Sequence, residues 1–518
     1  MKKTSLLALT VLFLFSCSTQ PKATPEQMAS YEKKMREGES LTNKADYTSL
    51  VEAYQVYETL LSIPMNHRQT REKLLKTCLL LSMRQKELGI LDETYLNRTR
   101  TLIESGTFPP EYRLALEIVE ALPFKVKGIT KDTILDEDAY TQPEKLEDKI
   151  PLWYESMKRR SGRDLLFTYL FLTLNCEFGK ILEEKIDLHA FRDSYATTPL
   201  VLYRLSVCGF PDQEVLENMI EKAPYFTEAY FHLGEAFLHE GKLSKAEKAY
   251  LKAFHTIPHS TAVVISLANI YFILEELEKS ISFYDKAITL APEYRDALLG
   301  KAIALSYLGR HEEALDTLKK LYDLGKYFLG ETHYWQAWNL RELGRLDKAR
   351  TNIEKAKNYL IGHAEVFILA GKTALDGKNT AAAEENFKEA LKIHKENCEA
   401  LFFLGKVYAL EENWGNSGLF YDRASQCYLY SEAALNEKIK EIETSGFSPE
   451  RIHIYVLTKN NQIKQIKEKR ASSDYNGALS YFYAGRFEDA LGLARRAAEH
   501  PAFKTKAATL IEQIKEKR

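Results

Sequence analysis

One pattern returns about every 34 residues between residues 227 and 430, and this recurrence constrains the fold more than any other feature of the chain. The first copy places aromatic, small and apolar residues at Tyr230, Leu233, Gly234, Phe237, Ala246, Tyr250, Ala253 and Pro258. The next copy fills the same eight places with Val264, Leu267, Ala268, Tyr271, Ser280, Tyr284, Ala287 and Pro292. A period of this length indicates repeated units of one supersecondary motif each.

Each unit has the pattern of two amphipathic helices. Apolar residues recur three and four positions apart on both sides of a break at Glu240-Gly241-Lys242. Small residues such as Gly234 and Ala246 allow the two helices to approach closely. Because one hairpin cannot bury its apolar faces alone, we expect the units to stack.

This skeleton resembles the tetratricopeptide (TPR) repeat family. The resemblance implies an all-α fold, a right-handed superhelical solenoid of helix-turn-helix repeats. Four looser copies follow the first two, and we assign their small residues at the helix-packing place to Ala302, Ala337, Ala370 and Gly405. Single-residue insertions are predicted near Gly325 and Asn379, in turns that tolerate them.

The first 25 residues resemble the start of a bacterial lipoprotein. Lys2 and Lys3 precede an apolar run, residues 6–15, that is too short to span a membrane. The stretch Leu14-Phe15-Ser16-Cys17 resembles a lipobox, which implies cleavage before Cys17 and acylation of that cysteine. Since Ser rather than Asp follows it, the resemblance favours a lipid anchor on the periplasmic face of the outer membrane. The alternative is an ordinary secretory signal with an incidental cysteine.

Composition and periodicity divide the chain into seven segments. We predict a signal peptide at 1–16, a tether at 17–25, an N-terminal helical region with degenerate TPR-like hairpins at 26–125, an acidic linker at 126–150, a helical region at 151–226 that leads into the array, six repeats at 227–430, and a C-terminal helical region with one further TPR-like repeat at 431–518. The formal net charge is only −2, which argues against bulk nucleic-acid binding.

The sequence carries no recognisable catalytic motif. Phosphate-binding loops, dinucleotide fingerprints, nucleophile elbows and zincin helices are missing. His232, Glu235 and His239 share one predicted helix face and could hold a metal, but no helix with a matching further ligand is visible. The sequence therefore predicts no enzyme, no cofactor and no metal site.

Five cysteines remain besides Cys17. Their odd number argues against a disulfide framework, and we expect most of them to be small buried hydrophobes. Cys398 and Cys427 are the exception, because they lie at ends of antiparallel helices that meet in the sixth repeat. Export would place this pair where disulfides persist, provided that the Cα atoms come within about 7 Å.

By the TPR resemblance, the first helix of each repeat lines a concave groove. The residue after the first skeletal aromatic, and those four and seven further on, should point into it: Phe231, Ile265, Leu299, Tyr334, Phe367 and Phe402, then Asn269, Ile303 and Trp338, then Phe272. Apolar residues are usual in the TPR scaffold at the first six places, whereas Ile303, Trp338 and Phe272 are less easily explained as scaffold residues. We predict that Trp338 projects into the groove between Ile303 and Arg341, and that Trp335 lies toward the packed or convex side.

These features predict a lipid-anchored periplasmic scaffold whose groove binds another envelope protein or a peptide segment of one. An accessory role in peptidoglycan synthesis or hydrolysis is a special case of this function. The alternative is a carrier or transporter accessory that binds a small hydrophobic ligand in the same groove; a closed pocket would favour the carrier and an open groove the scaffold. The Lys/Asn clamp of TPR proteins that hold chaperone tails is not reproduced, since Phe231 and Glu235 stand at its first two places.

Overall fold

The computed structural model describes residues 23–63, 67–122, 146, 148–178, 198–206, 208, 213–325 and 328–517. Over these ranges the chain forms 24 helices and no strand, so the predicted all-α fold is confirmed. The signal peptide, Cys17 and nearly all of the predicted acidic linker lie outside the described residues. None of the helices described is long and apolar enough to cross a membrane.

The N-terminal third consists of helices that pack around one core. They are α1 (Pro25–Lys44), α2 (Tyr47–Leu60), α3 (Arg68–Glu87), α4 (Thr94–Ser105), α5 (Pro110–Ala121), α6 (Ile150–Arg160), α7 (Leu165–Phe178), α9 (Pro199–Ser206) and α10 (Gln213–Lys222). In the α1–α2 hairpin, the buried ring of Tyr57 packs against Gly38.

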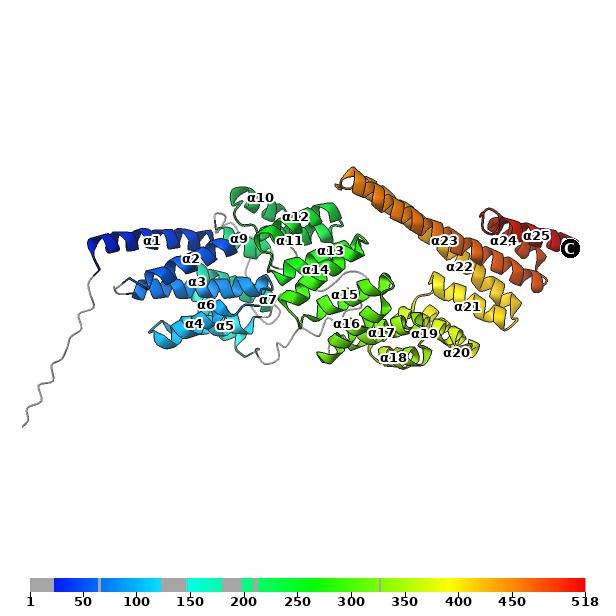
Figure 1. Cartoon of the computed structure of the whole chain (residues 1–518), viewed down its shortest axis with the longest axis horizontal. Coiled ribbons are helices and arrows are strands. Elements are labelled where there is room, and N and C mark those ends of the chain that lie inside the picture. Colours follow the sequence, from blue (N-terminus) through cyan, green and yellow to red (C-terminus); the bar gives the residue numbers. More distant parts are fainter. Residues whose placement is uncertain are drawn as a thin grey trace, which may run out of the picture.

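Six hairpins then follow at the predicted period. Their helices are α11 (Ala229–His239), α12 (Leu243–Thr256), α13 (Thr261–Ile273), α14 (Leu277–Leu290), α15 (Arg295–Tyr307), α16 (His311–Asp323), α17 (Leu329–Glu342), α18 (Leu346–Tyr359), α19 (Ala364–Asp376), α20 (Thr380–Ile393), α21 (Cys398–Leu410) and α22 (Trp414–Glu443). From α13 to α21 they form an arc, with the second helices α16, α18 and α20 on its outer side (Figure 1).

Each hairpin is held by a small residue on its first helix and a large one 16 positions later. A Cβ atom on Gly234 would lie 2.6 Å from the ring of Tyr250, so any side chain there would force the helices apart. Gly371 has the same relation to Phe387, with a Cβ distance of 2.6 Å. Close contact between the two helices of a repeat therefore depends on these positions.

This contact corrects the register of the fifth repeat by one residue. Its helix-packing place belongs to Gly371 and not to Ala370. The mid-repeat turns agree, because the residue with a left-handed backbone is Gly344 (φ 71°) in the fourth repeat and Lys378 (φ 59°), 34 positions later, in the fifth. The insertion predicted near Asn379 is therefore not needed.

A buried ionic network joins the N-terminal helices to the first repeat. Arg84 on α3 is fully buried, donates from Nη2 to Glu228 at 2.9 Å and pairs with Glu87. Its guanidinium also lies 4.1 Å from the ring centroid of Tyr203 on α9. Arg204, also buried, reaches Glu87 at 3.2 Å. Burial raises the pKa of the Glu228 carboxyl, and the charge of Arg84 opposes that rise.

The second helix of the sixth repeat, α22, continues beyond that repeat and forms a long helical hairpin with α23, which we call the arm. Helix α22 has 30 residues and α23 (Pro449–Tyr483) has 35, against 13 in α21, and α23 spans about 50 Å. The two helices are antiparallel, with Ser425 bonded to Asp474 at 2.8 Å. Helices α24 (Phe487–Ala498) and α25 (Lys504–Lys517) complete the chain.

The arm has the sequence pattern of a two-helix coiled coil. Apolar residues recur at spacings of three, four and seven: Leu435, Ile439 and Ile442 on α22, then Ile452, Val456, Ile463 and Ile466 on α23. This seam is narrow, and many of the remaining residues are charged. In Figure 1 the arm runs above the arc of repeats and back toward α13.

Candidate partner-binding groove

Half of the residues predicted to line the groove are buried instead. Phe231, Ile265, Asn269, Leu299 and Ile303 are each at most 6% exposed. Asn269 is enclosed, and its Oδ1 accepts a hydrogen bond from the Tyr284 hydroxyl at 2.6 Å. The prediction that these five face an open groove is corrected, since their side chains fill the spaces between and within the hairpins.

The other five predicted residues are half-buried, namely Phe272, Tyr334, Trp338, Phe367 and Phe402. With the corrected register, Phe367 no longer occupies a groove-side place. The centroid of its ring lies 5.5 Å from the Lys357 ammonium of α18. The groove-side residue of the fifth repeat is then Ile368, which is buried. Three of the remaining four rings lie in the second and fourth repeats.

A continuous series of rings crosses the second, third and fourth repeats, and we call it the aromatic strip. It consists of Phe272, Tyr307, Trp335 and Trp338, with successive centroids 5.9, 5.6 and 5.9 Å apart. All four belong to first helices, α13, α15 and α17, which lie on the inner side of the arc (Figure 1). The strip therefore belongs to the helices on the inner side of the arc.

The strip differs from the prediction at one place. Tyr307 is its most open member, 54% exposed, and was not predicted because it lies one residue beyond the three places considered in each repeat. Trp335 was expected on the packed or convex side, and its ring is packed: it is 8% exposed and lies between the rings of Tyr307 and Trp338. Trp338 packs against the cluster that contains Ile303, in agreement with its predicted neighbour.

A buried amide lies beside the strip. Asn339, fully buried, donates to the Ser306 hydroxyl at 2.8 Å and to the Trp335 carbonyl at 2.7 Å. Its Oδ1 accepts from Nδ1 of His311 at 3.0 Å, and the His311 ring lies 5.5 Å from Trp338. One side chain thus links α15, α16 and α17, the helices that carry or adjoin most of the strip.

The histidine considered as a metal ligand is engaged by protein groups. His232 bonds through Nδ1 to Glu235 at 2.9 Å and through Nε2 to the Tyr203 hydroxyl at 2.7 Å. Burial lowers its pKa, against the opposing effect of Glu235. Within the described ranges, no group of three or more His, Cys, Asp or Glu side chains is placed to hold a metal ion.

Comparison with known families decides the nature of the array. Models described as tetratricopeptide repeat match residues 227–255, 263–294, 296–324 and 368–428. The chain is a TPR repeat protein. The matches cover the hairpins from α11 to α16 and run from α19 into α22, whereas α17 and α18, the N-terminal helices and most of the arm lie outside them.

Individual relatives of this TPR protein are distant. Human Protein O-mannosyl-transferase TMTC1 is 23% identical over 204 residues, which is 38% of this chain and 23% of the relative. The chain thus spans less than a quarter of that relative's length. A tetratricopeptide repeat protein from Parabacteroides merdae is 16% identical over 52% of this chain and 95% of its own, with a TM-score of 0.37. YrrB, described as a TPR protein with an unusual peptide-binding site, is 22% identical over 35% and 93%, with a TM-score of 0.29.

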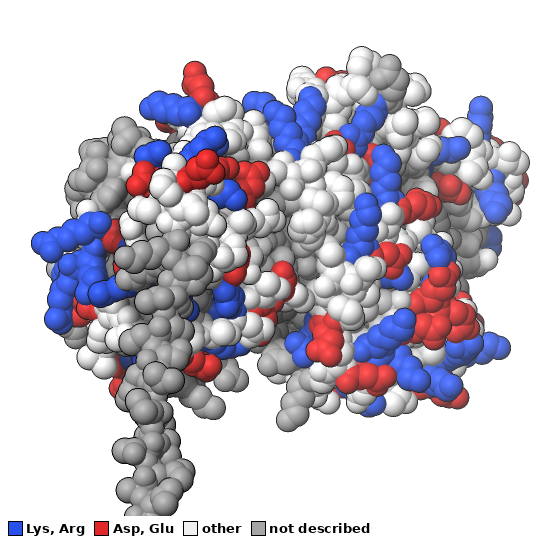
Figure 2. All heavy atoms as spheres, turned by 60° about the vertical axis from the view of Figure 1, so that its left-hand side comes forward, with Lys and Arg blue, Asp and Glu red and all other residues white. Residues whose placement is uncertain are grey.

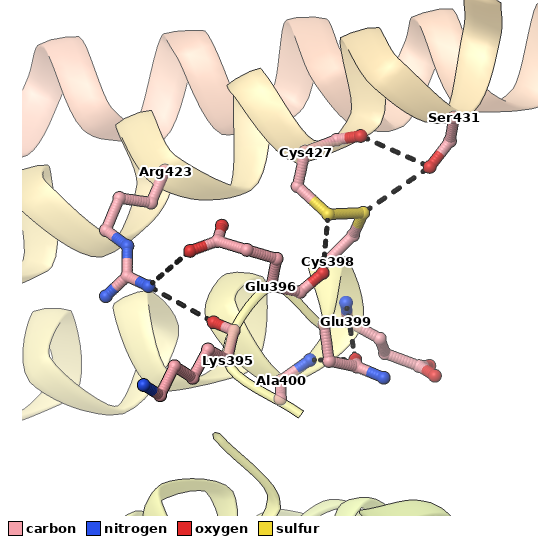
Figure 3. The surroundings of a disulfide bond; sticks show 9 residues. Lys395, Glu396, Cys398, Glu399, Ala400, Arg423, Cys427 and Ser431 are labelled. Atoms are coloured by element: carbon pink, nitrogen blue, oxygen red, sulfur yellow. Dashed lines mark hydrogen bonds and ion pairs between the residues drawn. A yellow bond between two sulfur atoms is a disulfide. The ribbon is translucent and has the colours of Figure 1, made fainter. Parts of the chain in front are cut away.

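The sixth TPR repeat contains the disulfide expected from the sequence, between Cys398 and Cys427, with Cα atoms 5.3 Å apart (Figure 3). Arg423 holds the same turn to α22 by donating to the Lys395 carbonyl and to Glu396, both at 3.2 Å. This disulfide therefore fixes the start of α21 against the middle of α22, at the root of the arm.

A second disulfide, between Cys176 and Cys208, was not predicted. It lies in the N-terminal region, where the TPR period gives no guide to which cysteines meet. The odd cysteine is Cys78, which is free and fully buried. The odd number of cysteines was thus a poor guide to whether disulfides form, because one buried thiol is compatible with two disulfides.

Proposed function

We propose that this TPR protein is a lipid-anchored scaffold of the bacterial cell envelope that holds another envelope protein, or a peptide segment of one, on its concave face. The aromatic strip carries the proposal. Rigid rings offer a large contact area at a low cost in side-chain entropy, and they are frequent binding hot spots. The strip extends over three repeats, which suits an extended peptide or a helix better than a small ligand in a closed pocket.

Two further observations support the location in the envelope. Disulfides persist outside the cytoplasm, and the chain contains two. The N-terminal sequence resembles a lipoprotein signal that ends at Cys17. The surface charge agrees with a protein partner, since Figure 2 shows basic and acidic residues intermingled on the face in view, as the net charge of −2 implies.

The strip is tested by crosslinking in intact cells, with identification of the co-purified proteins, and by Trp338→Ala. The substitution should weaken capture of the crosslinked partner by about 2 kcal/mol or more, roughly 30-fold, because a hot-spot ring is lost. Helical content should stay unchanged by circular dichroism. Trp414→Ala is the matched control, since Trp414 is another half-buried tryptophan and lies outside the strip. A variant that unfolds the array without a selective binding defect would show that Trp338 is a core residue.

The anchor is tested separately with Cys17→Ala. This variant should remain unprocessed or leave the membrane fraction, because two or three acyl chains are needed for firm attachment. Mass spectrometry of the wild-type N-terminus measures the modification directly. Unmodified wild-type protein that is free in the periplasm would contradict the anchor and leave the groove proposal untouched.

A further inference from the structure

The tip of the arm returns to the first two repeats. Lys248 on α12 donates to the Gly446 carbonyl at 3.0 Å. Arg451 on α23 pairs with Glu247 and donates to Glu276 at 2.6 Å. Residues that meet here are 175 to 204 positions apart in the chain. The tip is therefore a contact that the repeat pattern does not supply.

The contact has a small apolar centre and a charged border. Tyr455 is buried at 7% exposure, its hydroxyl bonds to Glu276, and its ring lies 5.1 Å from that of Phe447. Farther along α23, Lys459 pairs with Glu275, whose two oxygens also accept from Gln462 at 3.0 and 2.9 Å. The tip is held by few apolar groups and by several partly exposed charges.

The root of the arm is held differently. There α22 packs on α21 within the sixth repeat, and the Cys398–Cys427 disulfide links the two helices covalently. The arm thus connects the sixth repeat to the first two, and with the repeats between them it closes a ring. The residues of the aromatic strip belong to α13, α15 and α17, which lie on the side of the arc toward the arm in Figure 1.

We infer that the arm is a clasp that decides which partners reach the strip. While the tip is docked, an extended polypeptide segment can enter the ring but a folded domain cannot, and a folded domain is admitted when the tip releases. This inference rests on the proposed function, because it concerns access to the same concave face. Arg451 is 26% exposed and Glu276, one of its two partners, is 20% exposed, so water reaches this contact and the tip can release while the disulfide holds the root.

Docking of the tip is tested by a designed crosslink. A Cβ atom on Gly446 would lie 3.8 Å from Cβ of Ser244, which is an ideal separation for a disulfide. Ser244→Cys with Gly446→Cys should therefore form a crosslink under mild oxidation. Arg451→Glu, which faces Glu247 and Glu276 with a like charge, should slow that crosslinking about tenfold. Arg451→Glu with Glu276→Arg should restore it, and absence of the crosslink in the parent double-cysteine chain would overturn the clasp.

Access is tested with a biotin label and streptavidin, a folded probe. Tyr307 in the strip and Tyr359 on the outer helix α18 are matched, at 54% and 56% exposure. Each tyrosine is replaced in turn by cysteine, in a full-length chain that also carries Cys17→Ser. Cys78, the free cysteine among the described residues, is buried, so biotin-maleimide reacts with the added cysteine. Streptavidin should capture the residue-307 label about tenfold more slowly than the residue-359 label.

Arg451→Glu should reduce that difference to about twofold or less, because the ring opens. Arg310→Glu, at an exposed arginine paired with Glu313, is the charge-matched control and should leave the tenfold difference in place. Equal rates of streptavidin capture at the two positions in the chain without Arg451→Glu would overturn the inference. So would a difference between the two rates that Arg451→Glu does not change. The probe replaces the natural partner, so these outcomes are independent of whether the strip proves to be the binding site.

Discussion

Two arginines of this protein each engage two glutamates, at contacts of very different character. Arg84 joins the N-terminal helices to the first repeat and is fully buried with Glu228, which is 1% exposed. Arg451 joins the tip of the arm to the first two repeats and is 26% exposed, with Glu276 at 20%. Both arginines also lie close to aromatic rings, Tyr203 in one case and Tyr455 in the other.

The two contacts differ in how easily they dissociate. We call the buried contact around Arg84 the joint and the partly exposed contact around Arg451 the latch. Removing one partner of a buried ion pair leaves an uncompensated charge in the core and costs about 3–5 kcal/mol. A partly exposed pair is worth only about 1 kcal/mol or less, because water and salt screen it. The N-terminal region and the array therefore form one body, whereas the tip of the arm can dissociate.

The largest expected effect comes from breaking the joint. Arg84→Met should lower the free energy of unfolding by about 3–5 kcal/mol, because Glu228 would be left buried without its cation. Urea unfolding followed by circular dichroism measures this change. Arg310→Met, at an exposed pair, is the control and should change stability by less than about 0.5 kcal/mol. An Arg84→Met variant as stable as the control would show that the junction depends on apolar packing alone.

The next effect concerns the root of the arm. Cys398→Ser with Cys427→Ser should destabilise the sixth repeat by about 2–4 kcal/mol, because the disulfide closes a loop of 29 residues. Faster hydrogen exchange in α21 and the first half of α22 is the measurement. Cys176→Ser with Cys208→Ser removes a bond of similar span, 32 residues, in the N-terminal region and should leave exchange at the root unchanged. Equal exchange at the root in both variants would contradict this assignment.

Breaking the latch should have a smaller and more local effect. Arg451→Met should cost about 1 kcal/mol, since Arg451 and Glu276 are both partly exposed. Hydrogen exchange should quicken in residues 449–462 while α3 and α11, at the buried joint, stay protected. The radius of gyration from small-angle X-ray scattering should rise. Loss of protection in α3 as well would mean that the two contacts are coupled.

The smallest effect is a pH dependence of the latch. Burial alone would raise the pKa of Glu276, but hydrogen bonds from Lys279, Tyr455 and Arg451 outweigh it and lower that pKa. A carboxyl whose pKa is lowered on folding adds stability above its ordinary pKa of 4.5, and this stability is lost as the pH falls through the folded value. The radius of gyration should therefore rise below pH 4.5, and less so in Glu276→Gln. An equal rise in both would assign the effect to other carboxyls.

Local patterns in the sequence predicted the repeats well. The skeleton placed Gly234 against Tyr250 and Ala268 against Tyr284, because contacts inside one hairpin depend on a fixed spacing. The register failed in the fifth repeat, where Ala370 and Gly371 are both small and only the contact with Phe387 distinguishes them. The groove assignment failed at Ile265 and similar places for a related reason. A position in a repeat indicates a face of the helix, but the neighbouring repeat decides how much of that face is covered.

Contacts between distant segments could not be predicted. Residues 431–518 were predicted to be helical, yet nothing in the spacing of Ile452, Val456, Ile463 and Ile466 indicates that the tip docks on Glu247 and Glu276. The joint around Arg84 is similar, since its members come from helices spread over 144 residues. Repeat patterns define nearest-neighbour contacts only, and both features lie beyond that range.

The tip contact also sets the order in which the molecule is completed. Contacts within a stack of hairpins join residues close in the chain and form early, whereas those at the tip join residues 175 to 204 positions apart. The stacked repeats can therefore assemble before the tip docks. The ring is then the last feature to form. Every newly made molecule passes through a stage in which its concave face is uncovered, and a folded partner that meets it at that stage needs no later release of the tip.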